Sequence, residues 1–233
     1  MTKNIRTLVA GLAIAAVTST AGAQAAVFLE QEGTLGATEV SAFTFNGSAA
    51  DGYSFHSPVS YSYNGDSQNG LPEAEDGVAK LFLVETTTDG LTLFGVFDET
   101  SDGSGGTQNS TWRYFEGDSD GALIVRDDNN GNDYYDEIAH GYFLDHQWNS
   151  CCTDGFVFSL DFDEFDLLGE LIDDGTGLNK LVFVTPDEEI ELTLNDAFRI
   201  YTDTAAMPIP GALPLGALGF ASMMGMARRR RKA

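Results

Sequence analysis

Apolar and polar residues alternate with a period of two in several parts of the chain. Between residues 156 and 163 every even position holds phenylalanine or leucine, whereas Ser159, Asp161 and Asp163 are polar. Successive side chains of a strand point to opposite faces, so this pattern predicts a strand with one buried face. Residues 78–85 and 91–97 are apolar on both faces. They are expected to be central strands, joined by a hairpin turn at residues 87–90.

Further strands are expected where short runs of β-branched, aromatic and aliphatic residues lie between turn-rich breaks. The clearest breaks are residues 64–70 and 101–106, which are rich in Gly, Ser, Asn and Asp. The remaining strand candidates are residues 41–45, 59–63, 112–115, 122–126, 137–144, 181–185, 190–194 and 198–201.

Many short strands at a spacing of roughly 8–12 residues are typical of an antiparallel β-sandwich or jelly roll, and we expect an all-β fold of this kind. One stretch favours a short helix instead, because Phe165, Leu168 and Ile172 recur at spacings of three and four within residues 163–173. The sequence has neither a repeat of fixed period nor an internal linker. Residues 26–206 are therefore expected to form one domain with a substantial core.

The first 25 residues have the three parts of a secretory signal peptide. Lys3 and Arg6 precede an apolar stretch at residues 8–17, and small residues follow in the order Ala-Gly-Ala-Gln-Ala-Ala from position 21. A charged start, a short apolar centre and an A-x-A exit indicate export, with cleavage near Ala25 or Ala26. About ten apolar residues are too few to span a bilayer, so this segment is not expected to remain as an anchor.

The C-terminal segment, residues 207–233, also divides into three parts. A short proline motif is followed by 17 uncharged residues, 211–227, and then by a basic cluster. The uncharged run would form a helix of roughly 25 Å, just short of a hydrocarbon core of about 30 Å. We expect a minimal transmembrane helix whose basic end stays in the cytoplasm. The motif is Met207, Pro208, Ile209, Pro210 and Gly211, and the cluster is Arg228, Arg229, Arg230, Arg231 and Lys232.

This order of motif, helix and basic cluster resembles the PEP-CTERM class of bacterial sorting signals, specifically its VPLPA-CTERM variant. Both prolines of the V-P-L-P-A motif match, while Met207, Ile209 and Gly211 are conservative departures. The resemblance implies passage through the export machinery, retention in the inner membrane during sorting, processing by an exosortase-type membrane peptidase, and delivery to the cell surface or extracellular matrix. It implies nothing about the fold of the preceding domain. The alternative is a permanent single-span anchor without processing.

The charge of the exported region is extreme. All 36 Asp and Glu residues lie within residues 26–206, which contain only five basic residues, so this region carries a net charge of −31. Such a charge favours solubility and repels phosphate backbones and anionic membranes, which excludes nucleic-acid binding. It also suits a salt-rich medium, or divalent cations as counter-ions. The five basic residues are Lys80, Arg113, Arg126, Lys180 and Arg199.

Two neighbouring acidic stretches are candidates for a calcium site. Residues 116–127 match a twelve-residue calcium loop, with acids at positions 1, 3, 5 and 12, glycine at position 6 and an aliphatic residue at position 8. The flanks of this stretch resemble strands, whereas an EF-hand needs helices. Asp and Asn also crowd residues 127–137, and such crowding is costly unless a cation or water relieves it. The alternative is two acidic turns at strand ends. The candidate ligands are Glu116, Asp118, Asp120, Asp127, Asp133 and Asp136.

Cys151 and Cys152 are the only cysteines of the chain and stand side by side. Their Cα atoms are about 3.8 Å apart across a trans peptide bond, below the usual disulfide range of about 4.4–6.8 Å. Three states therefore stay open: a strained vicinal disulfide, two buried or free thiols, and bonds between molecules. The surrounding segment, residues 145–155, is either a rigid β-turn or a ligand site.

Motifs of common enzyme classes are absent, because the chain has no H-E-x-x-H, G-x-S-x-G or P-loop sequence. The three histidines have no ligand spacing, and structural roles are expected for them. We therefore expect a non-catalytic structural or binding protein, stabilised by calcium and associated with extracellular polysaccharide through Trp112, Tyr114 or Trp148. The alternatives are an extracellular polysaccharide hydrolase, which would need two converging carboxylates, and a matrix protein without a ligand.

Overall fold

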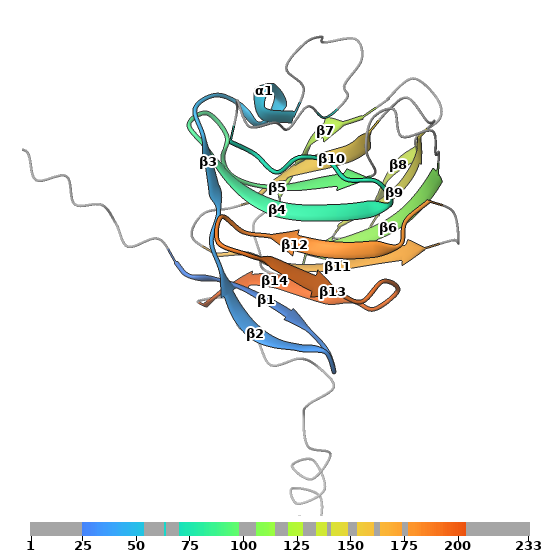
Figure 1. The fold of residues 1–233 in the computed structure, drawn as a ribbon. Helices are drawn as coiled ribbons and strands as arrows, with labels where there is room; N and C mark the ends of the chain where they lie inside the picture. Colours follow the sequence, from blue (N-terminus) through green and yellow to red (C-terminus); the bar gives the residue numbers. More distant parts are fainter. Residues whose placement is uncertain are drawn as a thin grey trace, which may run out of the picture.

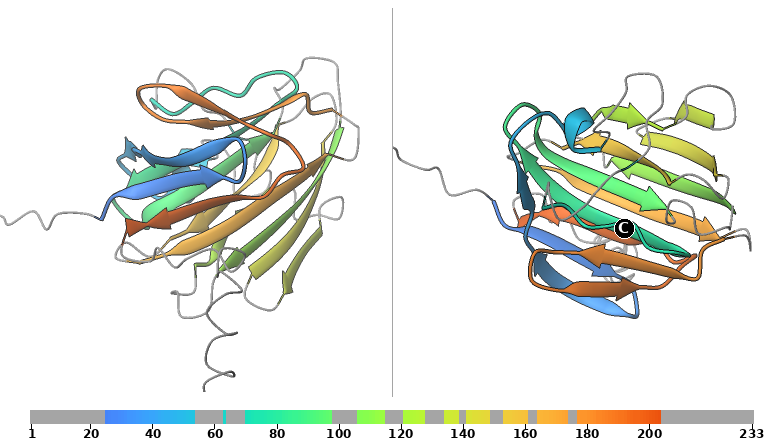
Figure 2. Two further views of the ribbon diagram at one scale, coloured as in Figure 1. Left: turned by 90° about the horizontal axis from the view of Figure 1, so that it is seen from below. Right: turned by 45° about the horizontal axis from the view of Figure 1, so that its top comes forward.

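The computed structural model describes residues 25–53, 63, 70–97, 106–114, 121–127, 134–138, 141–148, 153–160, 164–173 and 177–203. Within these ranges the chain forms two seven-stranded sheets and one short helix. The sheets lie face to face as two layers (Figures 1 and 2). The predicted all-β, sandwich-like fold is thus confirmed.

The first sheet is formed by β1 (Val27–Gln31), β2 (Leu35–Val40), β6 (Gly106–Tyr114), β8 (Tyr134–Ile138), β9 (Gly141–Trp148), β11 (Asp166–Asp173) and β14 (Phe198–Thr202). Its strand order is β2-β1-β14-β11-β6-β9-β8, and all neighbouring strands are antiparallel. Strands β1 and β14 therefore lie side by side although they stand at opposite ends of the domain sequence (Figure 1).

The second sheet is formed by β3 (Phe43–Phe45), β4 (Val78–Thr86), β5 (Gly90–Phe97), β7 (Leu123–Arg126), β10 (Asp154–Ser159), β12 (Lys180–Val184) and β13 (Glu189–Leu192). Its order is β13-β12-β4-β5-β10-β7, and β3 also pairs with β4. Both β3 and β12 run parallel to β4, so the prediction of a purely antiparallel sandwich is wrong on this point. A long connection precedes β4, and only long connections allow parallel pairing.

The main core lies between the sheets and is centred on Trp112. Its ring lies 5.0 Å from that of Phe156 and 5.6 Å from that of Phe198, and its indole Nε1 donates to Ser110 Oγ at 2.9 Å. Gly169 allows this packing, because a Cβ there would lie 2.6 Å from both the Trp112 and the Phe198 ring. The indole N–H is therefore satisfied while the ring is fully buried.

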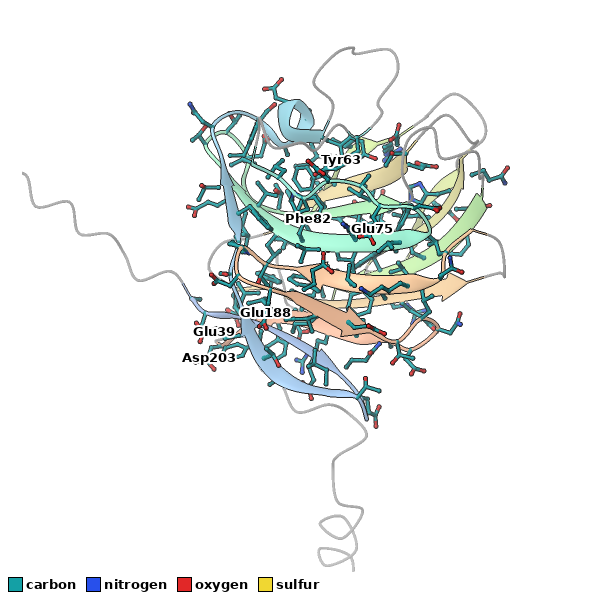
Figure 3. All side chains as sticks on the ribbon, in the orientation of Figure 1. Glu39, Tyr63, Glu75, Phe82, Glu188 and Asp203 are labelled. Atoms are coloured by element: carbon teal, nitrogen blue, oxygen red, sulfur yellow. The ribbon has the colours of Figure 1, made fainter. Side chains whose placement is uncertain are left out.

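A second hydrophobic cluster covers the outer face of the second sheet. Phe82 and Phe94 of the sheet stack with their centroids 5.3 Å apart. Helix α1 (Ala49–Tyr53) closes the cluster, because Tyr53 packs against both Phe94 and Tyr63. Figure 3 shows Tyr63 next to Phe82, where the rings are 6.0 Å apart. The central strands of this sheet are therefore apolar on both faces, as their sequence predicts.

The predicted hairpin at residues 87–90 is confirmed. Strands β4 and β5 are antiparallel, with Thr86 opposite Gly90. Gly90 adopts a φ of 77°, a conformation that glycine takes without steric cost, and the amide of Asp89 donates to Thr86 Oγ1 at 2.9 Å. Strands are also found within or overlapping the predicted ranges 41–45, 112–115, 122–126, 156–163, 181–185, 190–194 and 198–201.

Two predictions of local structure need correction, and some elements were missed. The helix expected at residues 163–173 is wrong, because Leu167, Gly169 and Leu171 alternate towards the core as strand β11. The single strand expected at residues 137–144 is two strands, β8 and β9, which pair with each other. Strands β1 and β2 and helix α1 were not predicted. The predicted strand at 59–63 lies outside the described residues except for Tyr63.

Candidate functional site

Many of the sequence-predicted functional residues lie outside the described residues. These are the signal peptide up to residue 24, the C-terminal segment from residue 204, and Cys151, Cys152, Glu116, Asp118, Asp120 and Asp133. In the part of the chain that the structure describes, no helix is long and apolar enough to cross a membrane. Two candidate calcium ligands, Asp127 and Asp136, are described.

Asp127 is buried under helix α1. Its side chain is only 1% exposed, and Tyr53 Oη donates to its Oδ2 at 2.7 Å. Asp127 lies opposite Gly155, whose carbonyl accepts from the Asp127 amide at 3.3 Å. A Cβ on Gly155 would lie 2.7 Å from the Tyr53 hydroxyl, so glycine makes room for this contact. Asp127 therefore holds α1 onto the second sheet.

Strand β7 interrupts the candidate calcium loop. Leu123–Arg126 occupy positions 8 to 11 of the twelve-residue match, and they pair with β10. The strand expected at residues 122–126 thus coincides with the end of the twelve-residue match, while residues 115–120 lie outside the described residues. Calcium binding by the acidic residues on either side of β7 stays a prediction.

Asp136 lies in the other sheet from Asp127. It is exposed on β8, opposite Phe143 of β9. The structure therefore does not bring the two described candidates into one site. Among the described residues as a whole, no group of three His, Cys, Asp or Glu side chains is placed to hold a metal ion.

His146 and Asp154 form a buried pair that links the two sheets. His146 Nδ1 lies 3.1 Å from Asp154 Oδ1, and the side chains are 0% and 4% exposed. Asp154 Oδ1 also accepts from the Gly155 amide at 2.6 Å. The His146 ring packs edge-on against Phe97 at 5.0 Å. The expected structural role of His146 fits this position, and its partner Asp154 was missed.

The segment between this pair crosses from one sheet to the other. Strand β9 ends at Trp148 in the first sheet, and β10 begins at Asp154 in the second. The segment 145–155 is therefore not the turn of a β-hairpin. A pairing across such a crossing cannot be found from sequence spacing, because it depends on how the two layers stack.

On the outer face of the first sheet, a group of side chains ties β14 to both neighbouring strands. Arg199 forms a two-pronged ion pair with Asp166 of β11. This hydrogen bonding raises the pKa of the Arg199 guanidinium above its ordinary value. Arg199 also lies 4.5 Å from the centroid of Tyr201, which stacks on Phe28 of β1. Burial, followed by the charge of Glu30, raises the pKa of the Tyr201 hydroxyl.

The structure excludes one of the aromatic residues proposed to meet a glycan. Trp112 is fully buried between the sheets, so it cannot stack on an external ligand. The apolar neighbours that bury it come from strands far away in sequence. Nothing in the structure bears on the side chains of Tyr114 and Trp148, which lie outside those described.

An outward-facing aromatic residue that sequence reasoning missed is Phe143. It is half-buried and stands opposite both Thr111 of β6 and Asp136 of β8. Thr111 in turn stands opposite Glu170 of β11. We call these four residues the outer row: Glu170, Thr111, Phe143 and Asp136. The row places an aromatic ring and a hydroxyl between two carboxylates on one sheet face.

A shallow hollow of about 430 Å³ lies at the edge of the second sheet. Glu191 is the only carboxylate among its lining residues, so this hollow lacks the pair of acids that glycoside hydrolysis requires. Its lining residues are Asn179, Lys180, Leu181, Glu191, Leu192, Thr193 and Leu194.

Comparisons of the chain with protein-family models, with curated proteins and with solved structures find no match.

Proposed function

We propose that this protein is an exported, non-catalytic domain of the bacterial cell surface or extracellular matrix. In this proposal a signal peptide directs export, and the C-terminal signal holds the chain in the inner membrane until an exosortase-type peptidase processes it. The order of motif, apolar run and basic cluster at residues 207–233 supports the sorting step.

The adjacency of the two domain ends supports a display role, and it is the observation that carries this proposal. The amide of Asp203 donates to the carbonyl of Ala26 at 3.1 Å, one step beyond the pairing of Val27 with Thr202. Both targeting segments therefore join the domain at the same end of the first sheet. A tether at that end would leave the opposite end of the sandwich, with the turn between β1 and β2, pointing away from the membrane.

Fractionation of a culture tests the sorting step. The proposal expects the domain at the cell surface or in the matrix, without the peptide 212–233. A chain with Pro208→Ala and Pro210→Ala is expected to accumulate in the inner membrane with its tail intact. A wild-type chain that stays in the inner membrane with the intact tail contradicts the sorting proposal.

We further propose that the outer row binds a neutral polysaccharide. A half-exposed aromatic ring offers an apolar face, while Thr111, Asp136 and Glu170 offer hydrogen-bonding oxygens on either side. Acidic polysaccharides fit less well, because the domain carries a net charge of −31.

A glycan array with and without calcium tests this ligand, followed by titration of the best neutral glycan. Phe143→Ala is expected to weaken binding by about tenfold or more, since a contact worth 1.4 kcal/mol is tenfold in affinity. Phe28→Ala is the matched control, because Phe28 lies at the far end of the same face against Tyr201. Silence of the array, or equal losses in the two variants, contradicts binding at the outer row.

Calcium is proposed as a stabilising ion for the acidic segments beside β7. Calorimetry at millimolar calcium is expected to show binding heat and a raised melting temperature. Magnesium at the same concentration is the control, since it demands a stricter octahedral geometry. The absence of both heat and melting shift with calcium removes this part of the proposal.

A further inference from the structure

Strand β14 is the link between the N-terminal strands and the rest of the first sheet. It pairs with β1 on one side, from Phe198 opposite Gln31 to Thr202 opposite Val27, and with β11 on the other. Strand β2 pairs with β1. Residues 25–40 therefore reach the first sheet through β14, and β14 is one of the last described segments of the chain.

The side chains of β14 join the same parts on both faces of the sheet. Towards the core, Phe198 packs on Trp112 and Ile200 is fully buried. Towards the outside, Arg199 pairs with Asp166 of β11 and Tyr201 stacks on Phe28 of β1. All five residues of the strand are buried.

Further hydrogen bonds hold the segment before β14 to β1, and the last residue of β14 to the residue that precedes β11. Gln31 Nε2 donates to the carbonyls of Thr193 and Asp196, at 2.9 and 3.1 Å, and its Oε1 accepts from the Thr193 amide. Thr202 and the backbone of Phe165 exchange hydrogen bonds. This junction therefore consists almost wholly of contacts between residues more than 30 positions apart in sequence.

We propose that β14 is a late closing strand. The first sheet of the exported chain stays incomplete until β14, which lies next to the C-terminal signal, is available to pair with β1 and β11. Without β14, the edges of β1 and β11 are unpaired, and Trp112 loses one of its ring neighbours. Contacts of such long sequence separation form only after the cost of loop closure has been met. A chain that enters the export machinery from its N-terminus thus remains unfolded and transportable. This last consequence rests on the export proposed above.

Hydrogen exchange on the full-length chain tests the closing role. Ile200→Pro removes a buried side chain and a ladder amide from β14, and it is expected to reduce protection of the β1 and β4 amides to the level of the denatured chain. Ile190→Pro in the edge strand β13 is the matched control, and it is expected to expose β13 alone. Native protection of the β1 amides in the Ile200→Pro chain overturns the proposal.

A strand supplied in trans separates loss of β14 from general misfolding. A chain ending at Asp196 is expected to be digested rapidly by protease, and a synthetic peptide of residues 197–203 is expected to restore protection. The same peptide with Ile200→Asp is the control. Protease resistance of the shortened chain without peptide overturns the proposal, and so does equal rescue by both peptides.

Moving β14 to the front of the domain tests the consequence for export. Because Asp203 and Ala26 are hydrogen-bonded, a short turn can join residue 203 to residue 25. A chain with residues 197–203 placed between the signal peptide and residue 25 is expected to fold early and to be retained inside the cell. Export at the wild-type rate overturns this consequence. The location of the unchanged chain, measured separately, reports on the proposed function itself.

Discussion

At the scale of single residues, two aspartates are buried with a partner, and one of them, Asp127, belongs to a stretch that the sequence marks as an acidic loop. Asp127 accepts a hydrogen bond from Tyr53, and Asp154 lies against His146 between the sheets. Burying a charge is costly unless hydrogen bonds and an opposite charge compensate for it. These contacts therefore specify how α1 and the two sheets dock.

Tyr53→Phe should destabilise the protein more than Tyr63→Phe. The Tyr53 hydroxyl donates to the carboxylate of Asp127, whereas the Tyr63 hydroxyl donates to the carbonyl of Pro72. Hydrogen bonds to charged groups contribute about 1.5–3 kcal/mol and neutral ones about 0.5–1.5 kcal/mol. Urea unfolding of the two variants measures the difference. Equal losses would show that the Asp127 carboxylate does not depend on Tyr53.

His146→Ala should cost about 3–5 kcal/mol of unfolding free energy, because the buried Asp154 then keeps the Gly155 amide but loses the imidazole beside its carboxyl group. The double variant His146→Ala with Asp154→Ala should lose less than the sum of the two single variants. The urea midpoints of the four proteins give this coupling energy. Additive losses would mean that the 3.1 Å contact contributes nothing to folding.

The sequence could predict many of the strands, but it could not predict which partners the side chains of Asp127 and Asp154 contact. The alternation in β10 and the two apolar runs of β4 and β5 are local signals, and they predicted that these segments are strands. The single buried face expected for β10 is wrong, because Val157 packs in the second hydrophobic cluster on the opposite face from Phe156 and Phe158. Asp127 follows an aliphatic run and precedes further acids, so its spacing matched a calcium loop equally well. Only the docking of α1, more than 70 residues earlier in the chain, gives Asp127 its partner.

At the scale of elements, helix α1 is too short to be stable alone and depends on its first turn. Ser48 Oγ accepts from the Asp51 amide at 3.1 Å, and Asp51 Oδ2 accepts from the Ser48 amide at 3.2 Å and from its hydroxyl at 2.6 Å. This is a capping box with aspartate at its third helical position. Asp89 Oδ2 adds a bond from the Ala49 amide at 2.6 Å.

The box should make α1 sensitive to acid. The Ser48 hydroxyl, and then its amide, lower the pKa of Asp51 below 3.8. A carboxyl group whose pKa is lowered in the folded state stabilises the fold at any pH above its ordinary pKa. This stabilisation is lost as the pH falls through the lowered pKa. Asp51→Asn should therefore cost a fraction of 1 kcal/mol at pH 6, since the group is exposed, and progressively less below pH 3.8. Unfolding of both proteins across this range measures it, and a constant difference would contradict the role of the charge.

Strand β11 shows why element type was mispredicted in one place. Its apolar residues are so numerous that both periods can be read from them: Phe165, Leu168 and Ile172 suit a helix, while Leu167 and Leu171 suit a strand. Phe165, Leu167 and Leu171 all belong to the main core, with Gly169 between the two leucines, which is a period of two. Pairing with β6 and β14 on both edges decides in favour of the strand, and this pairing is not a local property.

At the scale of the whole molecule, most of the few basic side chains form ion pairs with carboxylates. Lys80 lies 3.0 Å from Glu75, Lys180 lies 3.8 Å from Glu189, and Arg199 pairs with Asp166. The 36 carboxylates of the domain outnumber its five basic residues many times over. The folded state brings these charges closer together than the unfolded chain does, so their repulsion opposes folding.

Salt should therefore stabilise this protein, although salt weakens individual surface ion pairs. At 0.5 M sodium chloride the Debye length is well below its value of about 10 Å at 0.1 M, so repulsion among exposed carboxylates is screened more strongly. Relative to 20 mM salt, we expect the melting temperature to rise by several degrees, since 1 kcal/mol corresponds to about 2–4 °C for a domain of this size. Calcium chloride at matched ionic strength separates screening from site binding, because only a specific site adds a further rise. A fall in melting temperature with sodium chloride would mean that the paired cations contribute more to the fold than the net charge of −31 opposes it.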